Sequence, residues 1–427
     1  MAITKSATAL KTASNPAPLP DTDEALAPVK IALLLPAAYS LRDLRRAGEL
    51  AAGLADARTQ RGEALEVTVG LAERDEERWR RGERTIRSRA PAAVVRHLEW
   101  TSVPVDNARR MFHQLDPALD LEGLSEVIVP RDWGWNFQDC ALWISLADPA
   151  TGPVLPLRRI VYYSLGLPER YVPQMVAASI HDPYWARQAE AFRMWRQAEV
   201  VTSDPTTIAD LVSYAGVRSE RTEIIPDVLE SMAPLAQADE QDRNRQVLVW
   251  TLRGSSVDDL EACLAGLQIY RREGGLLDVV IAEEARADAA AHPSLAALPA
   301  DLLRLYGELR HVTYRSLDEL DRLLVRSGGL WSSQIAGGAG EHLLEAERAG
   351  LHVLAPSFPL NRQLAERRGL SARLYAPGEA LGIADALKEV EQLASTPVPL
   401  PAPQDEVPSS EKFGFLLDRL LANARAS

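Results

Sequence analysis

The residues best suited to chemistry lie in one segment, 327–363, where a glycine-rich turn precedes two acids. The turn is Gly337-Gly338-Ala339-Gly340, followed by Glu341 and, one helical turn later, Glu345. Glycines let backbone N–H groups approach a ligand, and a helix start offers unpaired donors to an anion. Carboxylates repel phosphate but accept hydrogen bonds from sugar hydroxyls, so the pattern suits a nucleotide better than a bare phosphate. On the glycine-rich pattern alone, a packing turn with a solvated glutamate is the favoured interpretation, because such turns are weak evidence.

The elements that must position these residues are those of a parallel sheet. An apolar run over 330–333 comes before the turn, a helix is predicted over 341–350, and a second apolar strand over 351–355. Strand, loop, helix and strand in this order form one unit of an α/β sheet. Ligands of such sheets bind at the carboxyl ends of the strands, which is where the turn falls.

This segment resembles the C-terminal signature of the family 4 retaining glycosyltransferases, which have the GT-B fold: two Rossmann-like domains whose parallel sheets face each other across a cleft. The matching residues are Gly338-Ala339-Gly340, Leu343-Leu344-Glu345-Ala346, Ala349-Gly350, Pro359, Asn361 and Arg362. The resemblance implies that Glu345 holds the nucleotide ribose and that Asn361 belongs to the same site. Gly337 stands where the family has an acid that contacts the donor sugar, and Glu341 is the nearest acid that could replace it.

The resemblance also assigns roles outside this segment. Arg253 stands close to the family's arginine that holds the donor diphosphate, but the lysine that usually follows is absent and Asp258-Asp259 lie nearby. Ser164 takes the approximate place of a strand-end histidine, and His181-Asp182 could be its displaced counterpart. We therefore expect Arg253 and Glu341 to be catalytic, with Arg253 and the backbone donors of 338–340 stabilising negative charge on the leaving diphosphate.

A polar and aromatic loop suggests an acceptor site. Asp132 and Trp133 follow an apolar strand predicted over 126–130, at the carboxyl end where ligands of α/β sheets bind. Tryptophans that pack a domain edge are an equally good interpretation of this loop.

Length, charge and cysteine content limit the number of domains and the kinds of partner that we expect. The chain has 427 residues, a net charge of −13 and a mean hydropathy of −0.14, which fits two domains and argues against a nucleic-acid partner. Its two cysteines, Cys140 and Cys263, fall in different predicted domains without metal-ligand spacing. We expect reduced thiols in a cytoplasmic protein that needs no metal or other cofactor.

The chain divides into four predicted segments. Residues 1–28 have the composition of a disordered arm, and 29–235 alternate predicted strands and helices as an acceptor-side Rossmann-like domain. A polar run starts a nucleotide-sugar-binding domain over 236–395. A proline-rich connector and an amphipathic helix occupy 396–427.

An arginine-rich stretch, 74–89, contains seven arginines and Trp79. It could bind anionic headgroups at the inner membrane face, with Trp79 as an interfacial anchor. A solvated helix with Glu–Arg pairs is the favoured alternative, because Glu76, Glu77 and Glu83 are suitably spaced.

Three functions fit these observations. A glycosyltransferase would move a sugar from a nucleotide-sugar donor to a glycan, lipid-linked or protein acceptor, with retention as the resemblance implies. A non-catalytic GT-B scaffold or binding subunit would explain why the first family acid, the lysine, the strand-end histidine and an early glycine pair are missing. A nucleotide-sugar epimerase or hydrolase is the third. The matching residues face ligand in the family, so we favour the transferase.

Overall fold

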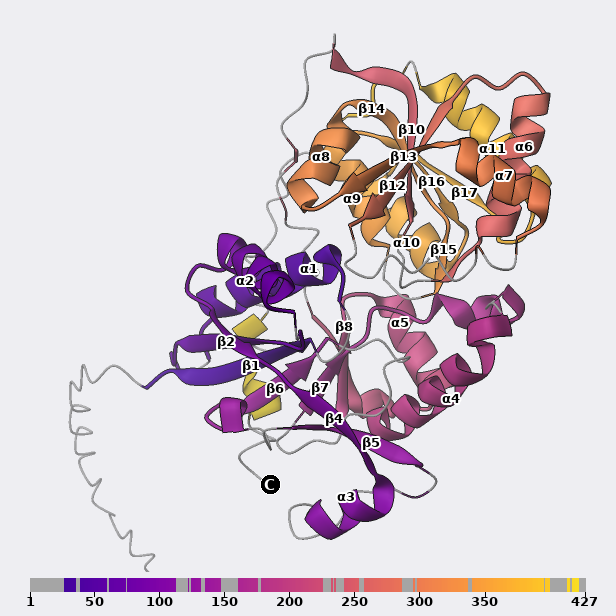
Figure 1. The fold of residues 1–427 in the computed structure, drawn as a ribbon. Helices are drawn as coiled ribbons and strands as arrows, with labels where there is room; N and C mark the ends of the chain where they lie inside the picture. The colour runs from indigo at the N-terminus through magenta and orange to yellow at the C-terminus, as the bar shows by residue number, and fades with distance from the viewer. Residues whose placement is uncertain are drawn as a thin grey trace, which may run out of the picture.

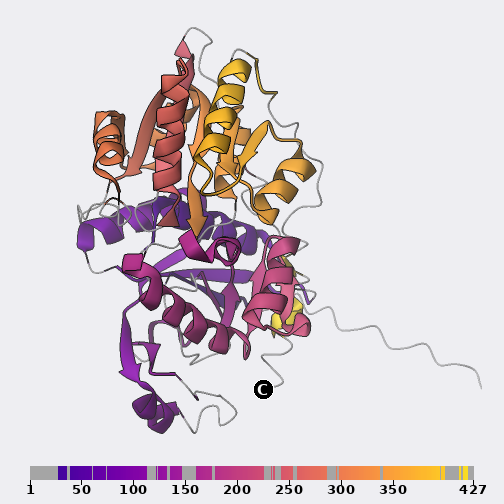
Figure 2. The ribbon, with the colours of Figure 1, turned by 90° about the vertical axis from the view of Figure 1, so that its right-hand side faces the viewer.

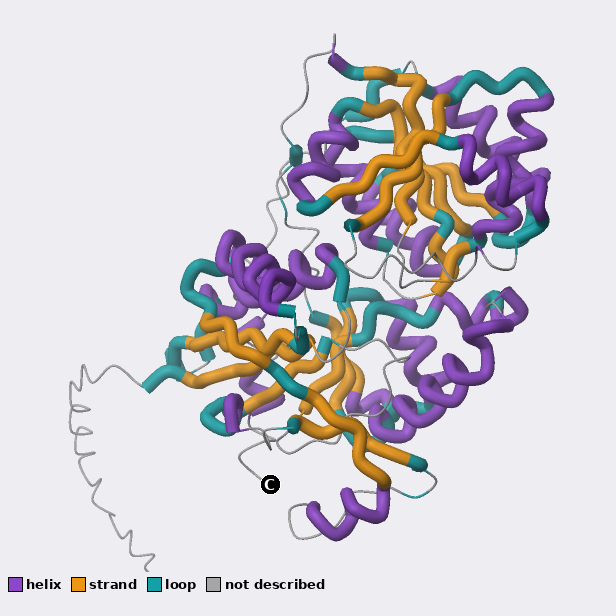
Figure 3. Tube along the Cα trace, viewed as in Figure 1, coloured by secondary structure: helices purple, strands orange, loops and turns teal. Residues whose placement is uncertain are grey.

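The protein consists of two α/β domains, one above the other in Figure 1. The computed structural model describes residues 27–35, 39–59, 61–73, 75–112, 122, 124–131, 135–146, 160–175, 178–225, 232, 234–235, 242–252, 257–285, 295, 298–336, 340–394, 396–399, 413–414 and 417–421. In each domain the strands form a central layer between helices (Figure 3). The prediction of two parallel α/β sheets is confirmed.

The N-terminal domain is built on a seven-stranded parallel sheet in the order β3-β2-β1-β6-β7-β8-β9. The strands are β1 (Val29–Leu35), β2 (Leu65–Leu71), β3 (Val94–His97), β6 (Leu142–Ser145), β7 (Ile160–Tyr163), β8 (Glu199–Thr202) and β9 (Thr222–Ile224). The helices are α1 (Leu41–Asp56), α2 (Glu76–Arg89), α3 (Val105–Phe112), α4 (Ala178–Trp195) and α5 (Pro205–Asp210), with short turns η3 (Pro168–Tyr171) and η4 (Pro173–Met175).

The C-terminal domain has a six-stranded parallel sheet in the order β13-β12-β10-β14-β16-β17. Its strands are β10 (Asn244–Leu252), β12 (Asp278–Glu284), β13 (Arg310–Tyr314), β14 (Ser327–Ser332), β16 (His352–Pro356) and β17 (Ala372–Tyr375), with a small antiparallel pair of β11 (Val257–Asp258) and β15 (Gln334–Ala336). The helices are α6 (Leu260–Arg272), α7 (Ala300–Glu308), α8 (Leu317–Val325), α9 (Glu341–Ala349), α10 (Pro359–Arg368) and α11 (Ala380–Leu393).

Local sequence explains where α1 begins. Ser40 accepts a hydrogen bond from the backbone N–H of Asp43, and the Asp43 carboxylate accepts one from the backbone N–H of Ser40, which makes a reciprocal capping box. The preceding strand, β1, is buried along almost its whole length. Strands buried on both faces are typical of parallel sheets covered by helices.

The end of the chain returns to the N-terminal domain. Residues 413–414 and 417–421 are helical, and Phe413, Leu417, Leu420 and Leu421 are buried in a cluster with the core of that domain. Figure 2 shows this yellow segment beside the N-terminal domain. Arg419 also forms an ion pair with Glu223 at 2.6 Å, so apolar and charged contacts both hold the segment there.

The strand predicted over 126–130 is correct in extent but wrong in position. This strand, β5 (Glu126–Pro130), pairs antiparallel with β4 (Trp100–Pro104) in a separate two-stranded ribbon. The loop after it therefore does not lie at the carboxyl end of a strand of the main sheet, which was the physical reason for placing an acceptor site there. Asp132 and Trp133 themselves lie outside the described residues.

The arginine-rich helix α2 favours the solvated interpretation. Three of its arginines pair within the helix, as in Arg80–Glu76 at 3.0 Å and Arg87–Glu83 at 2.9 Å, and Arg89 pairs with Glu49 of α1 at 3.3 Å. Trp79 stacks on His97 with ring centroids 4.1 Å apart, so its ring packs within the domain instead of anchoring at an interface. In the described part of the chain no helix is long and apolar enough to span a bilayer.

Candidate functional site

Helix α9 and the glycine that begins it form the centre of the predicted site. Gly340 caps α9 with a left-handed φ of 61°, which strains any residue with a side chain, and a Cβ there would also lie 2.9 Å from a Leu364 methyl carbon that would have to shift. The Asn361 side chain donates to the carbonyl of Pro356 at 2.8 Å and holds the start of α10 against β16. Gly337, Gly338 and Ala339 lie outside the described residues.

The predicted ribose acid, Glu345, is bound by two arginines from the other domain. Arg42 donates from Nε to Oε1 at 2.8 Å and from Nη2 to Oε2 at 2.6 Å, which makes a bidentate pair. Arg45 donates from Nη2 to Oε1 at 2.5 Å. All three side chains are buried. Both carboxylate oxygens are therefore occupied in this conformation, and a ribose could reach them only if the arginines moved away.

The predicted catalytic acid, Glu341, has the same kind of partner. Arg46 pairs with Glu341 at 2.5 Å, and both side chains are buried. The backbone N–H of Leu41 donates to both carboxylate oxygens of Glu284, at 3.2 and 3.1 Å, where β12 ends. The first turns of α1 thus cover the carboxyl end of β12 and the start of α9. We call Arg42, Arg45, Arg46, Glu341 and Glu345 the α1–α9 latch.

In the latch, positive charges from arginines offset the cost of burying the glutamate carboxylates. Burial alone would raise the pKa of Glu345, but the guanidinium groups of Arg42 and Arg45 outweigh it and hold that pKa well below its usual range. Nearby, burial raises the pKa of Asp321 on α8, although Arg348 and Arg45 oppose the shift. The two arginines of α1 thus hold the Glu345 carboxylate in its charged form despite its burial.

Sequence reasoning missed the three arginines of α1. The available signal was their spacing: positions 42, 45 and 46 lie on one face of a helix. Arginines on such a face are usually solvated, and nothing local indicates that their partners lie some 300 positions away.

The domains also touch on an apolar flank. Val172 of the N-terminal domain forms a small buried cluster with Ile335 and Phe358 of the C-terminal domain. The ring of Tyr171 lies 6.3 Å from that of Phe358. Apolar contacts on this flank and ionic contacts at the latch hold the two domains together.

Ser164 does not join this cluster. Ser164 is buried at the end of β7, where its hydroxyl accepts from the N–H of Gly166 at 3.4 Å, so it supports a turn. Arg253 lies outside the described residues, and so do the side chains of His181 and Asp182 on α4. Metal-binding groups of three or more His, Cys, Asp or Glu are absent from the described residues.

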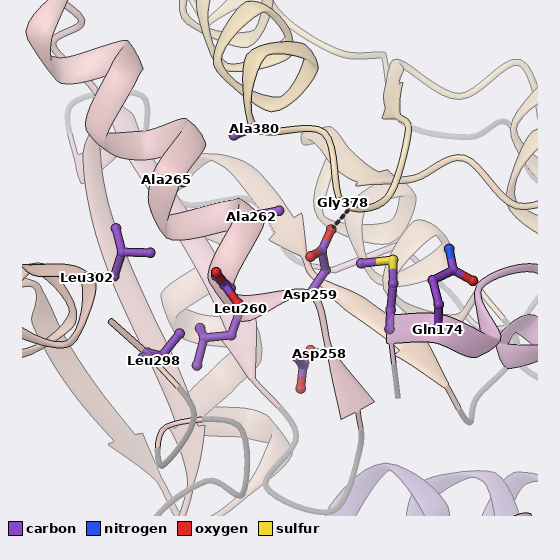
Figure 4. Close-up of a pocket in the computed structure, with 12 residues that line it drawn as sticks. Gln174, Asp258, Asp259, Leu260, Ala262, Ala265, Leu298, Leu302, Gly378 and Ala380 are labelled. Atoms are coloured by element: carbon purple, nitrogen blue, oxygen red, sulfur yellow. Dashed lines mark hydrogen bonds between the residues drawn. The ribbon is translucent and has the colours of Figure 1, made fainter. Parts of the chain in front are cut away.

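A separate pocket of about 510 Å³ opens between the start of α6, α7 and η4 (Figure 4). Leu298 and Leu302 supply an apolar wall, and Asp258 and Asp259 lie at its other side. Asp258 accepts from Ser333 at 2.8 Å, and Asp259 accepts from the backbone N–H of Gly378 at 2.7 Å. Burial raises the pKa of Asp259 to about 6 despite that hydrogen bond. Both acids thus have structural partners.

Comparison with solved structures identifies the architecture. HepE of Anabaena in complex with UDP-glucose superposes with a TM-score of 0.55 at 13% identity, over 93% of this chain and 99% of that chain. The chain has the GT-B fold. Sucrose-phosphate synthase from Thermosynechococcus elongatus gives a TM-score of 0.53 at 13% identity, over 93% and 97% of the chains. A candidate UDP-N-acetylglucosamine 2-epimerase from Listeria monocytogenes gives 0.51 at 10% identity, over 94% and 98%. The sequence matches no protein-family model and no curated protein.

Proposed function

We propose that the protein is a nucleotide-sugar-dependent glycosyltransferase of the family 4 type, which transfers a hexose to a glycan, lipid-linked or protein acceptor with retention. One observation carries the proposal: Glu345 lies one turn into α9, at the face of the C-terminal domain turned toward the N-terminal domain, in a chain with the GT-B fold. HepE, which shares this fold along nearly the whole chain, was solved with UDP-glucose.

The described residues would act by binding and by charge compensation. Once the arginines withdraw, Glu345 can accept hydrogen bonds from ribose hydroxyls, and Glu341 from hydroxyls of the donor sugar. The helix dipole and the backbone N–H groups at the start of α9 would stabilise negative charge on a leaving diphosphate. Arg253 is proposed as a further diphosphate ligand, because a guanidinium group binds phosphate in a bidentate manner. The acceptor site stays a proposal for the loop that contains Asp132 and Trp133.

The latch favours a second candidate, a non-catalytic GT-B subunit. Its buried ion pairs occupy both acids that a donor would need. In this alternative α1 replaces the nucleotide permanently and the fold serves as a rigid binding surface.

A ligand screen separates the two candidates. A ligand that binds only the folded state raises the melting temperature by mass action. The transferase should respond to a nucleoside diphosphate among UDP, GDP and ADP, and to the matching nucleotide sugar, with sugar transferred when a glycan acceptor is added. A donor that is consumed without an acceptor would indicate a hydrolase, and one that is converted to an isomer would indicate an epimerase. The absence of any shift with the whole panel would contradict the transferase and favour the non-catalytic candidate instead.

A further inference from the structure

We infer that α1 is an autoinhibitory latch, which closes the nucleotide face of the C-terminal domain until the two domains separate. The inference rests on the proposed function, since it concerns access to the same site. Figure 1 shows α1 on the side of the N-terminal domain that is turned toward the C-terminal domain. Its arginines reach α9 there, and its first N–H reaches the end of β12.

The latch competes with a nucleotide because both use the same atoms. A ribose needs the carboxylate oxygens of Glu345, and each of these already accepts from a guanidinium group. Binding therefore requires an open form in which Arg42 and Arg45 have left. If only a fraction of the molecules is open, the observed dissociation constant rises in inverse proportion to that fraction.

The closed form leaves some buried hydrogen-bond donors of Arg45 without partners in the part of the chain that the structure describes, which favours opening. Nε and Nη1 of Arg45 are buried and have no hydrogen-bond partner among the described residues. Buried donors without partners carry a desolvation cost that water would relieve on opening. The charged groups also regain hydration when the domains part. These effects offset part of the loss of the ion pairs.

The latch is surrounded by further charges that fix its position. Asp43 lies 3.6 Å from Arg46 within α1, and Glu284 binds the start of the helix. On the C-terminal domain, Asp321 and Arg348 interact electrostatically with Arg45. Because the latch is one part of this larger charged set, loss of one arginine should loosen the closed form without unfolding either domain.

Arg46→Ala is the test variant, because Arg46 touches Glu341 and leaves the partners of Glu345 in place. The variant and the wild type are titrated with UDP, GDP and ADP by calorimetry, and their radii of gyration are measured by small-angle scattering without ligand. A latch predicts about tenfold tighter nucleotide binding and a larger radius of gyration for the variant. The matched control is Arg368→Ala, which removes a similarly buried arginine from its pair with Glu347, at 2.7 Å within the C-terminal domain. It should change neither quantity.

The outcomes distinguish the inference from the proposed function. If both proteins bind a nucleotide and the variant binds it no more tightly than the wild type, the latch is overturned while the nucleotide site is supported. An unchanged radius of gyration would overturn it as well, since the domains would then close without Arg46. If neither protein binds any of the three nucleotides, the proposed function fails and the autoinhibition fails with it. In that case an expanded variant would still show that Arg46 holds the domains together.

Discussion

Glu345 accepts hydrogen bonds from two buried arginines in the closed form of the protein. Glu345→Gln keeps the shape of the side chain but leaves Arg42 and Arg45 buried without an anion. Removing one partner of a buried pair costs about 3–5 kcal/mol, so we expect urea unfolding to report a loss of about 3 kcal/mol. Glu77→Gln is the control: that side chain is 82% exposed and pairs with Arg81 at 3.5 Å, so its change should stay within about 0.5 kcal/mol. If both variants lost the same small amount of unfolding free energy, the buried ion pairs of Glu345 would not stabilise the fold.

The pH dependence of the same variant follows from the lowered pKa of Glu345. A carboxyl group with a lowered folded-state pKa contributes stability above its unfolded-state pKa of about 4.3, and that contribution is lost as the pH falls further. The free energies of unfolding of wild type and variant should therefore differ at neutral pH and converge in acid. A constant difference down to about pH 3 would be inconsistent with this pKa.

The pH dependence of stability that Asp259 contributes should have the opposite sign to that of Glu345. Burial raises its pKa to about 6, so the folded state loses stability as the pH rises from the unfolded-state value of about 3.9 to about 6. Asp259→Asn removes the charge and keeps an acceptor for the N–H of Gly378. The variant should be more stable at pH 7.5, by up to about 3 kcal/mol, and its stability should not decline over that window. A variant that is less stable at pH 7.5, with the same slope, would show that the carboxylate is needed there.

At the scale of elements, local sequence predicts helices and strands but not their partners. The strand that precedes the turn and the helix that carries Glu345 are where the pattern predicts them, and Gly350 ends α9 with a left-handed φ of 61°. The arginines of α1 have the spacing of a helix face, but their burial contradicts the usual preference of arginine for solvent. A short apolar run such as β5 fits a main sheet or a separate ribbon equally well. Only tertiary packing decides between the two.

The C-terminal segment is the element whose contribution can be measured most directly. Phe413 is buried against the N-terminal domain, and a Cβ added to Gly53 would lie 2.8 Å from its ring. Phe413→Ala removes a buried ring and leaves a cavity, so we expect a loss of about 3–5 kcal/mol in the free energy of unfolding. Leu381→Ala, at a side chain that is 69% exposed, is the control and should cost little. A loss below about 1 kcal/mol for Phe413→Ala would mean that the segment is not docked in solution.

At the scale of the molecule, the two sheets follow from composition and periodicity, whereas the way the domains meet does not. Apolar runs such as β1 and β14 are buried along most of their length, which is the pattern of parallel sheets covered on both faces. The contact between domains depends on a few charged side chains, on three apolar residues from distant segments, and on an apolar cluster that α1 shares with α9. Such pairings leave no periodic signal in the sequence. The fold could therefore be predicted, but not the closed state of the candidate site.

The domain contact should make the whole molecule unfold as one unit. One continuous apolar cluster contains Leu44 and Leu50 of α1 together with Leu343 and Leu344 of α9, and the latch lies on the same two helices. Domains that share so much buried contact lose it together, so we expect a single calorimetric transition for the wild type, with equal calorimetric and van't Hoff enthalpies.

Removing the two arginines that bind Glu345 tests this coupling. The double variant Arg42→Ala/Arg45→Ala leaves a buried carboxylate without its guanidinium groups, which favours separation of the domains and rehydration of the acid. Each domain keeps its own sheet and at least one apolar cluster of its own, so each can then melt separately. We expect two resolved transitions in scanning calorimetry, while Arg368→Ala lowers the melting temperature of a single one. Two transitions already present in the wild type would mean that the latch and the shared cluster do not couple the domains.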